Sequence, residues 1–168
     1  MHSLALLEAG TLWCDRPVEA AAALEPALEL YVSGDHAGAV IAFGQLVAGP
    51  TFREAIDDVL APGWFEQAVK DIDTFFQVEL PAMSKWHFTR DMAARITQPV
   101  LSVLGGDSAA VDPWAVEEHE LLQAWMPQTE SFVLPGATHA LQLMQPAGMA
   151  GGLAAFFARH PMRPAAGG

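Results

Sequence analysis

The segment PVLSVLGGDS, residues 99–108, decides how this chain is expected to fold. Residues 99–104 form an almost uninterrupted apolar run, which is typical of a strand buried on both faces of a parallel sheet. Two glycines follow, and then Asp107 and Ser108, so a tight polar loop ends the strand. Because ligand sites in open α/β sheets form at the carboxyl ends of strands, this loop is a candidate for chemistry.

Two other apolar runs, residues 3–7 and 131–134, predict two more strands of the same kind. Roughly ninety residues separate the first run from the second, whereas a crossover between parallel strands needs only about a dozen. The patterns between and after the runs are helical. The order strand, helical insertion, strand, helix, strand, helix predicts an α/β fold with a partial parallel sheet of about three strands.

Capping residues and prolines set the expected limits of the helices. We expect a first helix to begin at Pro17, to kink or restart at Pro26, and to end near residues 33–34. Asp35 is a suitable N-cap for the next helix. A long amphipathic helix is predicted over residues 65–80, with Pro81 ending or bending it, and a last helix is predicted over residues 146–159.

Composition excludes several classes of protein. The chain has 168 residues, of which 52% are hydrophobic, so a disordered chain is excluded. A net charge of −12 has the wrong sign for binding nucleic acid or an anionic membrane. Cys14, the single cysteine, cannot form an internal disulfide, and the sequence contains neither a secretion signal nor the ~18 apolar residues of a membrane helix. We therefore predict a cytoplasmic protein.

Two loops at predicted strand ends carry residues suited to acid–base chemistry. Asp107 follows the second strand, and His139 follows the third in the sequence PGATH, residues 135–139. On adjacent strands, the two could pair as an orienting carboxylate and a general base. The segment EEHE, residues 117–120, has no second histidine one helical turn away, so we interpret it as a solvated helix face. The sequence predicts no metal site and no cofactor.

Residues 99–108, the stretch HELLQAWMP, and the stretch from residue 130 to 161 together resemble the C-terminal part of the α/β-hydrolase fold. In that family the penultimate strand ends in the acid loop, and the last strand leads to the catalytic histidine in a G-x-x-H context. The resemblance implies that residues 1–9 are the strand before the lid, 10–97 a helical lid, 98–160 the C-terminal core with its acid and histidine loops, and 161–168 a flexible tail.

The chain departs from the family in its nucleophile and its acid. It contains no G-x-S-x-G, the elbow that carries the nucleophile of these enzymes. Ser108 lies in the nearest comparable string, but the family's chain order argues against it as a nucleophile. The usual acid loop reads G-x-x-D, so counting from Gly105 places Ser108 at the acid position. Asp107 is our preferred carboxylate, with Asp112 or Glu8 as alternatives.

The resemblance therefore implies a fragment of a serine-type ester hydrolase or a related enzyme, inactive alone, with a small apolar or ester-like substrate for the complete enzyme. By analogy with lids, aromatic residues that pack between helices would also line an apolar pocket, namely Trp64, Phe65, Phe75, Phe76, Trp86 and Phe88. We expect a missing N-terminal half, or self-association through the first strand. The alternative is a non-catalytic helical interaction module that pairs with a partner through its open sheet edge.

Overall fold

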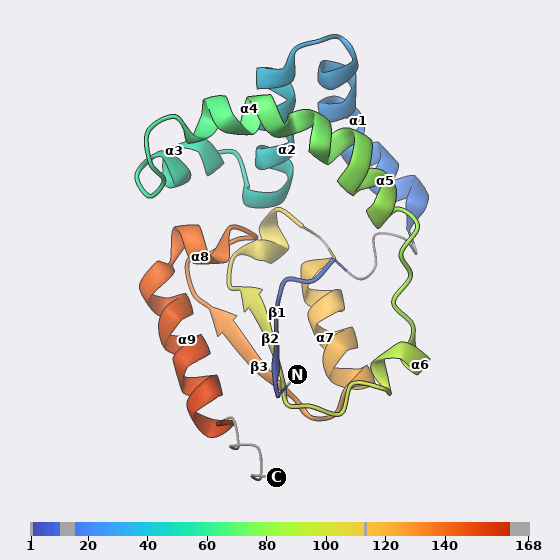
Figure 1. The fold of residues 1–168 in the computed structure, drawn as a ribbon, viewed down its shortest axis with the longest axis vertical. Coiled ribbons are helices and arrows are strands. Elements are labelled where there is room, and N and C mark those ends of the chain that lie inside the picture. The colour runs from blue at the N-terminus through green and yellow to red at the C-terminus, as the bar shows by residue number, and fades with distance from the viewer. Residues whose placement is uncertain (1, 11–15, 113, 162–168) are drawn as a thin grey trace, which may run out of the picture.

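The computed structural model describes residues 2–10, 16–112 and 114–161 and has a mixed α/β fold (Figure 1). One parallel sheet has the strand order β1 (Leu4–Leu7), β2 (Val100–Gly105) and β3 (Thr129–Leu134). Leu4 pairs with Val100, which in turn pairs with Thr129. The three predicted strands are confirmed to within two residues at their ends.

The strands differ in burial according to their place in the sheet. Every residue of the central strand β2 is buried, as the sequence predicts. The residues of β1 are only partly buried, and Val133 in β3 is 48% exposed. The expectation of burial on both faces is therefore wrong for β1 and β3, because each has a neighbouring strand on one side only in the described sheet.

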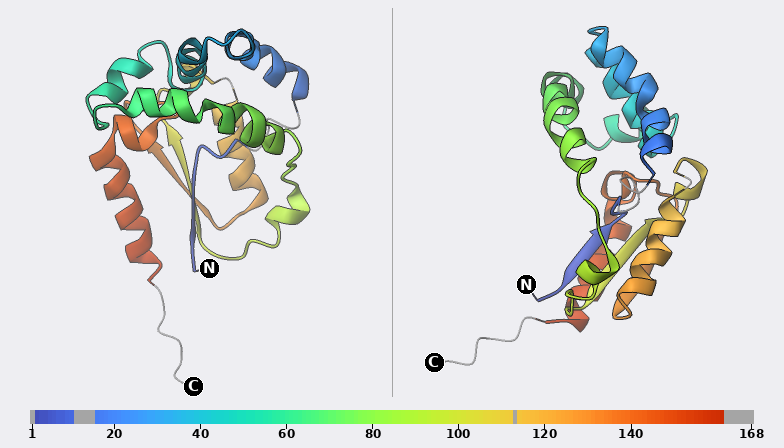
Figure 2. Two further views of the ribbon diagram at one scale, coloured as in Figure 1. Left: turned by 45° about the horizontal axis from the view of Figure 1, so that its top comes forward. Right: turned by 90° about the vertical axis from the view of Figure 1, so that its right-hand side faces the viewer.

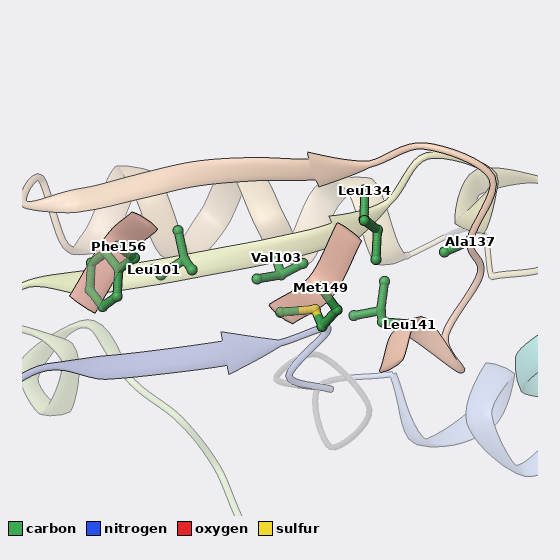
Figure 3. Packing of buried hydrophobic residues seen from close by; sticks show 7 residues of the cluster. All are labelled: Leu101, Val103, Leu134, Ala137, Leu141, Met149 and Phe156. Atoms are coloured by element: carbon green, nitrogen blue, oxygen red, sulfur yellow. The ribbon is translucent and has the colours of Figure 1, made fainter. Parts of the chain in front are cut away.

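Helices cover both faces of the sheet. On one face, Met149 and Phe156 of α9 (Pro146–Arg159) pack in one cluster with Leu101 and Val103 (Figure 3). On the other face, Leu122 of α7 (Ala115–Trp125) packs in a second cluster with Val100. Alternate residues of β2 thus supply the two clusters, as the two-residue period of a strand requires.

The chain between β1 and β2 forms a helical region over residues 17–93. Its elements are α1 (Pro17–Val32), α2 (His36–Ala48), α3 (Phe52–Asp57), α4 (Trp64–Thr74), the π-helical turn η1 (Phe75–Glu79), α5 (Leu80–Met83) and α6 (Arg90–Ala93). Helices α1 to α5 lie over the carboxyl ends of the strands (Figures 1 and 2). Two short elements belong to the loops of the sheet, the 3-10 turn η2 (Ser108–Ala110) and α8 (Leu141–Met144).

Several helix limits follow the sequence signals. The carboxylate of Asp35 caps α2 by accepting the N–H of Gly38 at 2.9 Å, which confirms the predicted cap. The expected restart at Pro26 is wrong, because α1 is one helix from residue 17 to 32. Neighbouring Leu24 and Ala27 are buried, and this packing offsets the hydrogen bond that Pro26 cannot donate. The long helix continues past Pro81 to Met83 through a π-helical turn.

No described helix combines the length and the apolar character needed to cross a membrane. Cys14 and residues 162–168, which make up nearly all of the expected flexible tail, lie outside the described residues.

Candidate functional site

Glu8 joins the loops at the carboxyl ends of all three strands. It follows β1 directly, and its side chain is only 3% exposed. Glu8 Oε1 accepts hydrogen bonds from the N–H of Gly105 at 2.6 Å and from the Ser108 hydroxyl, both in the loop after β2. Glu8 Oε2 accepts a hydrogen bond from His139 Nδ1 at 3.1 Å, in the loop after β3. Every acceptor oxygen of this buried carboxylate therefore has a donor.

The backbone at Glu8 is strained. Its φ of 42° lies in the left-handed region, which no other described non-glycine residue adopts. Its N–H still donates to the carbonyl of Val103 at 3.0 Å, so the strain begins where strand pairing ends. Such conformations cost about 1–3 kcal/mol and persist where the surrounding contacts determine them, often at functional sites.

Glycine at position 105 allows the second and third loops to approach. A Cβ on Gly105 would overlap the carbonyl oxygen of Ala137 and the hydroxyl of Ser108. The N–H of Asp107 donates to that same carbonyl at 3.0 Å, and the hydroxyl of Thr138 donates to the carbonyl of Ala48 at 2.9 Å. These contacts hold the loop of His139 between the sheet and the C-terminal end of α2.

The charges of Glu8 and His139 stabilise each other. Burial raises the pKa of Glu8, but the hydrogen bonds from His139, Ser108 and Gly105 outweigh it and bring the pKa below the usual value. The hydrogen bond to Glu8 raises the pKa of His139 against the effect of burial, and the nearby charges of Asp112 and Glu118 act in the same direction. The imidazole, 45% exposed, remains accessible on the side away from Glu8.

The pair faces a small cavity of about 100 Å³ between the sheet loops and the helical region. Its polar lining consists of Glu8, Asp112, Glu118 and His139. Its apolar lining comes from the helical region and comprises Leu24, Phe43, Val47, Phe75, Leu80 and Met83. A titratable pair beside an apolar cavity is the usual arrangement of a small-molecule site.

The carboxylate that contacts His139 is Glu8, one of the two alternatives, and this corrects our preference for Asp107. Asp107 is exposed, and its backbone serves to join the two loops. Asp112 lines the cavity, where its carboxylate accepts the N–H of Trp114. Ser108 is fully buried and donates to Glu8. Two features of the sequence pointed to this outcome. The loop from Gly105 to Ser108 places a serine at the acid position of the family, and Glu8 supplies a carboxylate at the end of the first strand.

Of the six aromatic residues expected to line a pocket, Phe75 lines this cavity and the other five do not. Phe76 is buried in the helical region against Ala39 and Ile72, while Phe65 packs at the edge of that cluster, and Trp64 packs against Phe52. Trp86 stacks on Phe88, which contacts the end of α7. The other five pack elsewhere because helical periodicity identifies an apolar face without showing which cavity, if any, that face lines.

The interpretation of the segment EEHE as a solvated face is correct for Glu117 and Glu120, which are exposed, and wrong for the two residues between them. Glu118 and His119 are 4% and 7% exposed. His119 Nδ1 lies 2.7 Å from the hydroxyl of Ser102 in β2, and its Nε2 lies 2.8 Å from the hydroxyl of Ser131 in β3. Ser102 and Ser131 are register partners on adjacent strands and both contact His119, so the sheet supplies polar partners that a helix pattern alone cannot reveal.

Comparison with known proteins gave no relative: no family model, curated protein or solved structure matches the chain. Among the described residues, no group of three or more His, Cys, Asp or Glu side chains is arranged to hold a metal ion.

Proposed function

We propose that this chain forms the acid–histidine half of a lidded α/β hydrolase, with the helical region as the lid. The observation that carries the proposal is the Glu8–His139 hydrogen bond between the loops that follow β1 and β3, at the carboxyl ends of the strands and beside a cavity roofed by helices. The parallel strand order and the two loops that follow β2 and β3 are consistent with it. The substrate class is a small ester or a related uncharged compound.

In the proposed reaction, His139 is the general base. Its Nδ1–H donates to Glu8, so Nε2 is the nitrogen free to take the proton from a hydroxyl nucleophile as that oxygen bonds to the ester carbon. Glu8 holds this tautomer and stabilises the imidazolium that forms. The same proton then passes from Nε2 to the leaving alcohol, and a water molecule repeats the cycle to release the acid.

The nucleophile must come from outside the described site. Ser108 is fully buried and its hydroxyl donates a hydrogen bond to Glu8, so this hydroxyl cannot reach a substrate beside His139. Strand β1 lies at an edge of the described sheet, with an apolar sequence, LALL, along that edge. A further parallel strand could pair there and bring a nucleophile elbow next to the histidine loop.

The same open edge favours a second candidate function, a non-catalytic interaction module. In that case a partner strand would pair with β1, and the Glu8–His139 pair would serve only to hold the loops together. The two functions differ in whether a reactive serine accompanies the chain.

Activity-based labelling tests the proposal. The tagged chain is purified from the cells that produce it after treatment with a fluorophosphonate, which labels activated serines. We expect a label on a G-x-S-x-G serine that is joined to the chain or bound to it. A label on Ser108, or a purified chain without any labelled serine, would overturn the proposal, and the second result would favour the interaction module.

Matched variants link the label to the site. His139→Ala and Glu8→Gln are expected to lower the rate of labelling, because they remove the base or its orienting group. Glu120→Gln is the control, since this carboxylate is exposed on α7 and does not line the cavity. Equal labelling in all three variants would show that the pair does not activate the serine.

A further inference from the structure

The cavity at His139 adjoins a larger groove in the helical region. This groove has a volume of about 500 Å³ and lies between α2 and α4. Three side chains, those of Phe43, Val47 and Phe75, line both the groove and the cavity. Ala140, the residue after His139, also lines the groove. The two spaces are therefore neighbouring compartments separated by a thin apolar wall.

Two aromatic rings form the centre of that wall. The ring centroids of Phe43 and Phe75 are 4.3 Å apart at an interplanar angle of 47°. Aromatic pairs in this geometry attract each other beyond their burial, so the wall is a specific contact. The cavity on the His139 side, at about 100 Å³, has room for only a few water-sized groups.

The π-helical turn explains how Phe75 reaches the wall. The N–H of Leu80 bonds to the carbonyl of Phe75, which joins residues five apart rather than four. One full helical turn therefore separates Phe75 from Leu80, and both side chains line the cavity at His139. In a regular α-helix, residues five apart would point in different directions. π-Helical turns of this kind occur frequently at functional sites.

Charge limits what the small cavity can hold. Three carboxyl groups, those of Glu8, Asp112 and Glu118, line it beside a single imidazole. Within the described part of the chain, neither Lys nor Arg lines the cavity or the groove. A carboxylate or phosphate in this place would face repulsion, whereas an uncharged carbonyl compound would not.

We propose that Phe43 and Phe75 set an upper limit on the length of the acyl chain of an uncharged substrate at His139, and that Phe75 is the specificity-determining residue. The inference rests on the proposed function, because it takes His139 as the reacting end of the cavity. With the wall in place, only short acyl groups fit. Without the Phe75 ring, the cavity opens into the apolar groove and longer chains become accessible.

Binding of 2-alkanones, from 2-butanone to 2-nonanone, tests the limit without requiring turnover. These ketones present an ester-like carbonyl, and the imidazole resonances of His139 report their binding by NMR. In the wild-type chain we expect affinity to stop rising at a short chain length. In Phe75→Ala it should continue to rise, by about fourfold for each added methylene. Hexanoate at pH 8 should bind at least tenfold more weakly than 2-hexanone, on the charge argument above.

Further variants keep the test decisive. Phe75→Trp should move the limit to shorter ketones, and Phe43→Leu should move it to longer ones even if Phe75→Ala does not fold. Val78→Ala is the control, because Val78 belongs to the same π-helical turn but is 61% exposed and lines neither space. A limit that stays unchanged in the folded variants, or hexanoate binding as tightly as 2-hexanone, would overturn the inference.

This experiment separates the two proposals. Absence of a labelled serine, together with a chain-length limit that changes with residue 75, would contradict the hydrolase proposal and support a binding site for uncharged ligands. A labelled serine together with an unchanged chain-length limit would support the hydrolase proposal and contradict the proposed role of Phe75.

Discussion

His139 and His119 lie in two regions that shift the pKa of a histidine in opposite directions. At the carboxyl edge of the sheet, a hydrogen bond to the buried Glu8 raises the pKa of His139. Between α7 and the sheet, burial lowers the pKa of His119 against the opposing charges of Glu120 and Glu8, and its hydrogen-bond partners are the neutral hydroxyls of two serines. The surroundings of His139 favour its protonated form, and those of His119 favour its neutral form.

The difference shows how partner chemistry decides the role of a histidine. A neutral imidazole has one donor and one acceptor nitrogen, and serine hydroxyls can satisfy both, so His119 joins β2 and β3 without any charge. A carboxylate accepts only, so His139 must donate to Glu8. His139 is also the more exposed of the two, which gives its second nitrogen access to a ligand. The accessible histidine with a charged partner therefore lies at the edge of the sheet, and the buried histidine joins two strands through neutral partners.

The largest expected effect tests the edge region. In the proposed enzyme, Glu8→Gln should lower the rate of serine labelling by about 10³- to 10⁴-fold, as the loss of the orienting carboxylate does in serine enzymes. Asp107→Asn, which changes the carboxylate that the sequence favoured, should leave the rate unchanged. If Asp107→Asn instead caused the large loss, Glu8 would be a structural residue and the assignment of the acid would be wrong.

The next effect tests the buried region. His119→Ala should cost about 2–4 kcal/mol of unfolding free energy, because it leaves a cavity and an unsatisfied hydroxyl at Ser102, which is 2% exposed. Urea unfolding measures this loss. Ser131→Ala is the matched control, since Ser131 lies at the exposed end of the bridge and its loss should cost less. A His119→Ala loss below about 0.5 kcal/mol, the range of surface substitutions, would show that the bridge does not support the fold.

A smaller effect concerns the support of Glu8. Ser108→Ala removes a charge-assisted hydrogen bond and should cost about 1–3 kcal/mol of unfolding free energy. It should also raise the pKa of Glu8, because a donor that favours the ionised form is lost. NMR titration of the Glu8 carboxyl carbon measures the shift, with the exposed Ser84→Ala as the control. An unchanged titration would mean that Ser108 does not bond to Glu8 in solution.

The smallest expected effect is a difference in pH dependence, and it compares the two histidines directly. The pKa of folded His139 is raised, so its contribution to stability is complete below pH 6.5 and is lost as pH rises through the folded value. The pKa of folded His119 is lowered, so its contribution is complete above pH 6.5 and is lost as pH falls toward the folded value.

The two effects oppose each other in the wild-type chain. Between pH 7.5 and 5.5, lowering the pH should therefore destabilise His139→Gln, and it should stabilise His119→Gln, both relative to the wild type. Urea unfolding across this range measures the slopes. The same direction of change in both variants would contradict the assigned difference between the two regions.

Much of the fold could be predicted because its signals are local. The three apolar runs, the cap at Asp35 and the last helix over residues 146–159 are all present as predicted. Local signals failed where distant groups decided the outcome. Pro26 lies inside α1 because buried neighbours support the helix, and His119 is buried because two strands provide hydroxyls for it.

The site could be predicted only in part. His139 was identified by its position after a strand, and the loop from Gly105 to Ser108 was identified by its glycines and polar residues. The choice of Glu8 over Asp107 depends on side-chain direction at the ends of two parallel strands. The strained φ of Glu8 and the close approach of Gly105 to Ala137 set that direction, and neither has a sequence pattern of its own.

The sequence by itself determined the order of elements, the parallel sheet and the loops in which chemistry is expected, because apolar period, caps and strand ends act over a few residues. Only the tertiary structure decided which carboxylate pairs with His139, which aromatic rings border its cavity and which histidine has its pKa lowered by burial. These outcomes depend on contacts between segments up to 131 residues apart, such as Glu8 and His139. Burial and hydrogen-bond partners at such distances are properties of the packed molecule.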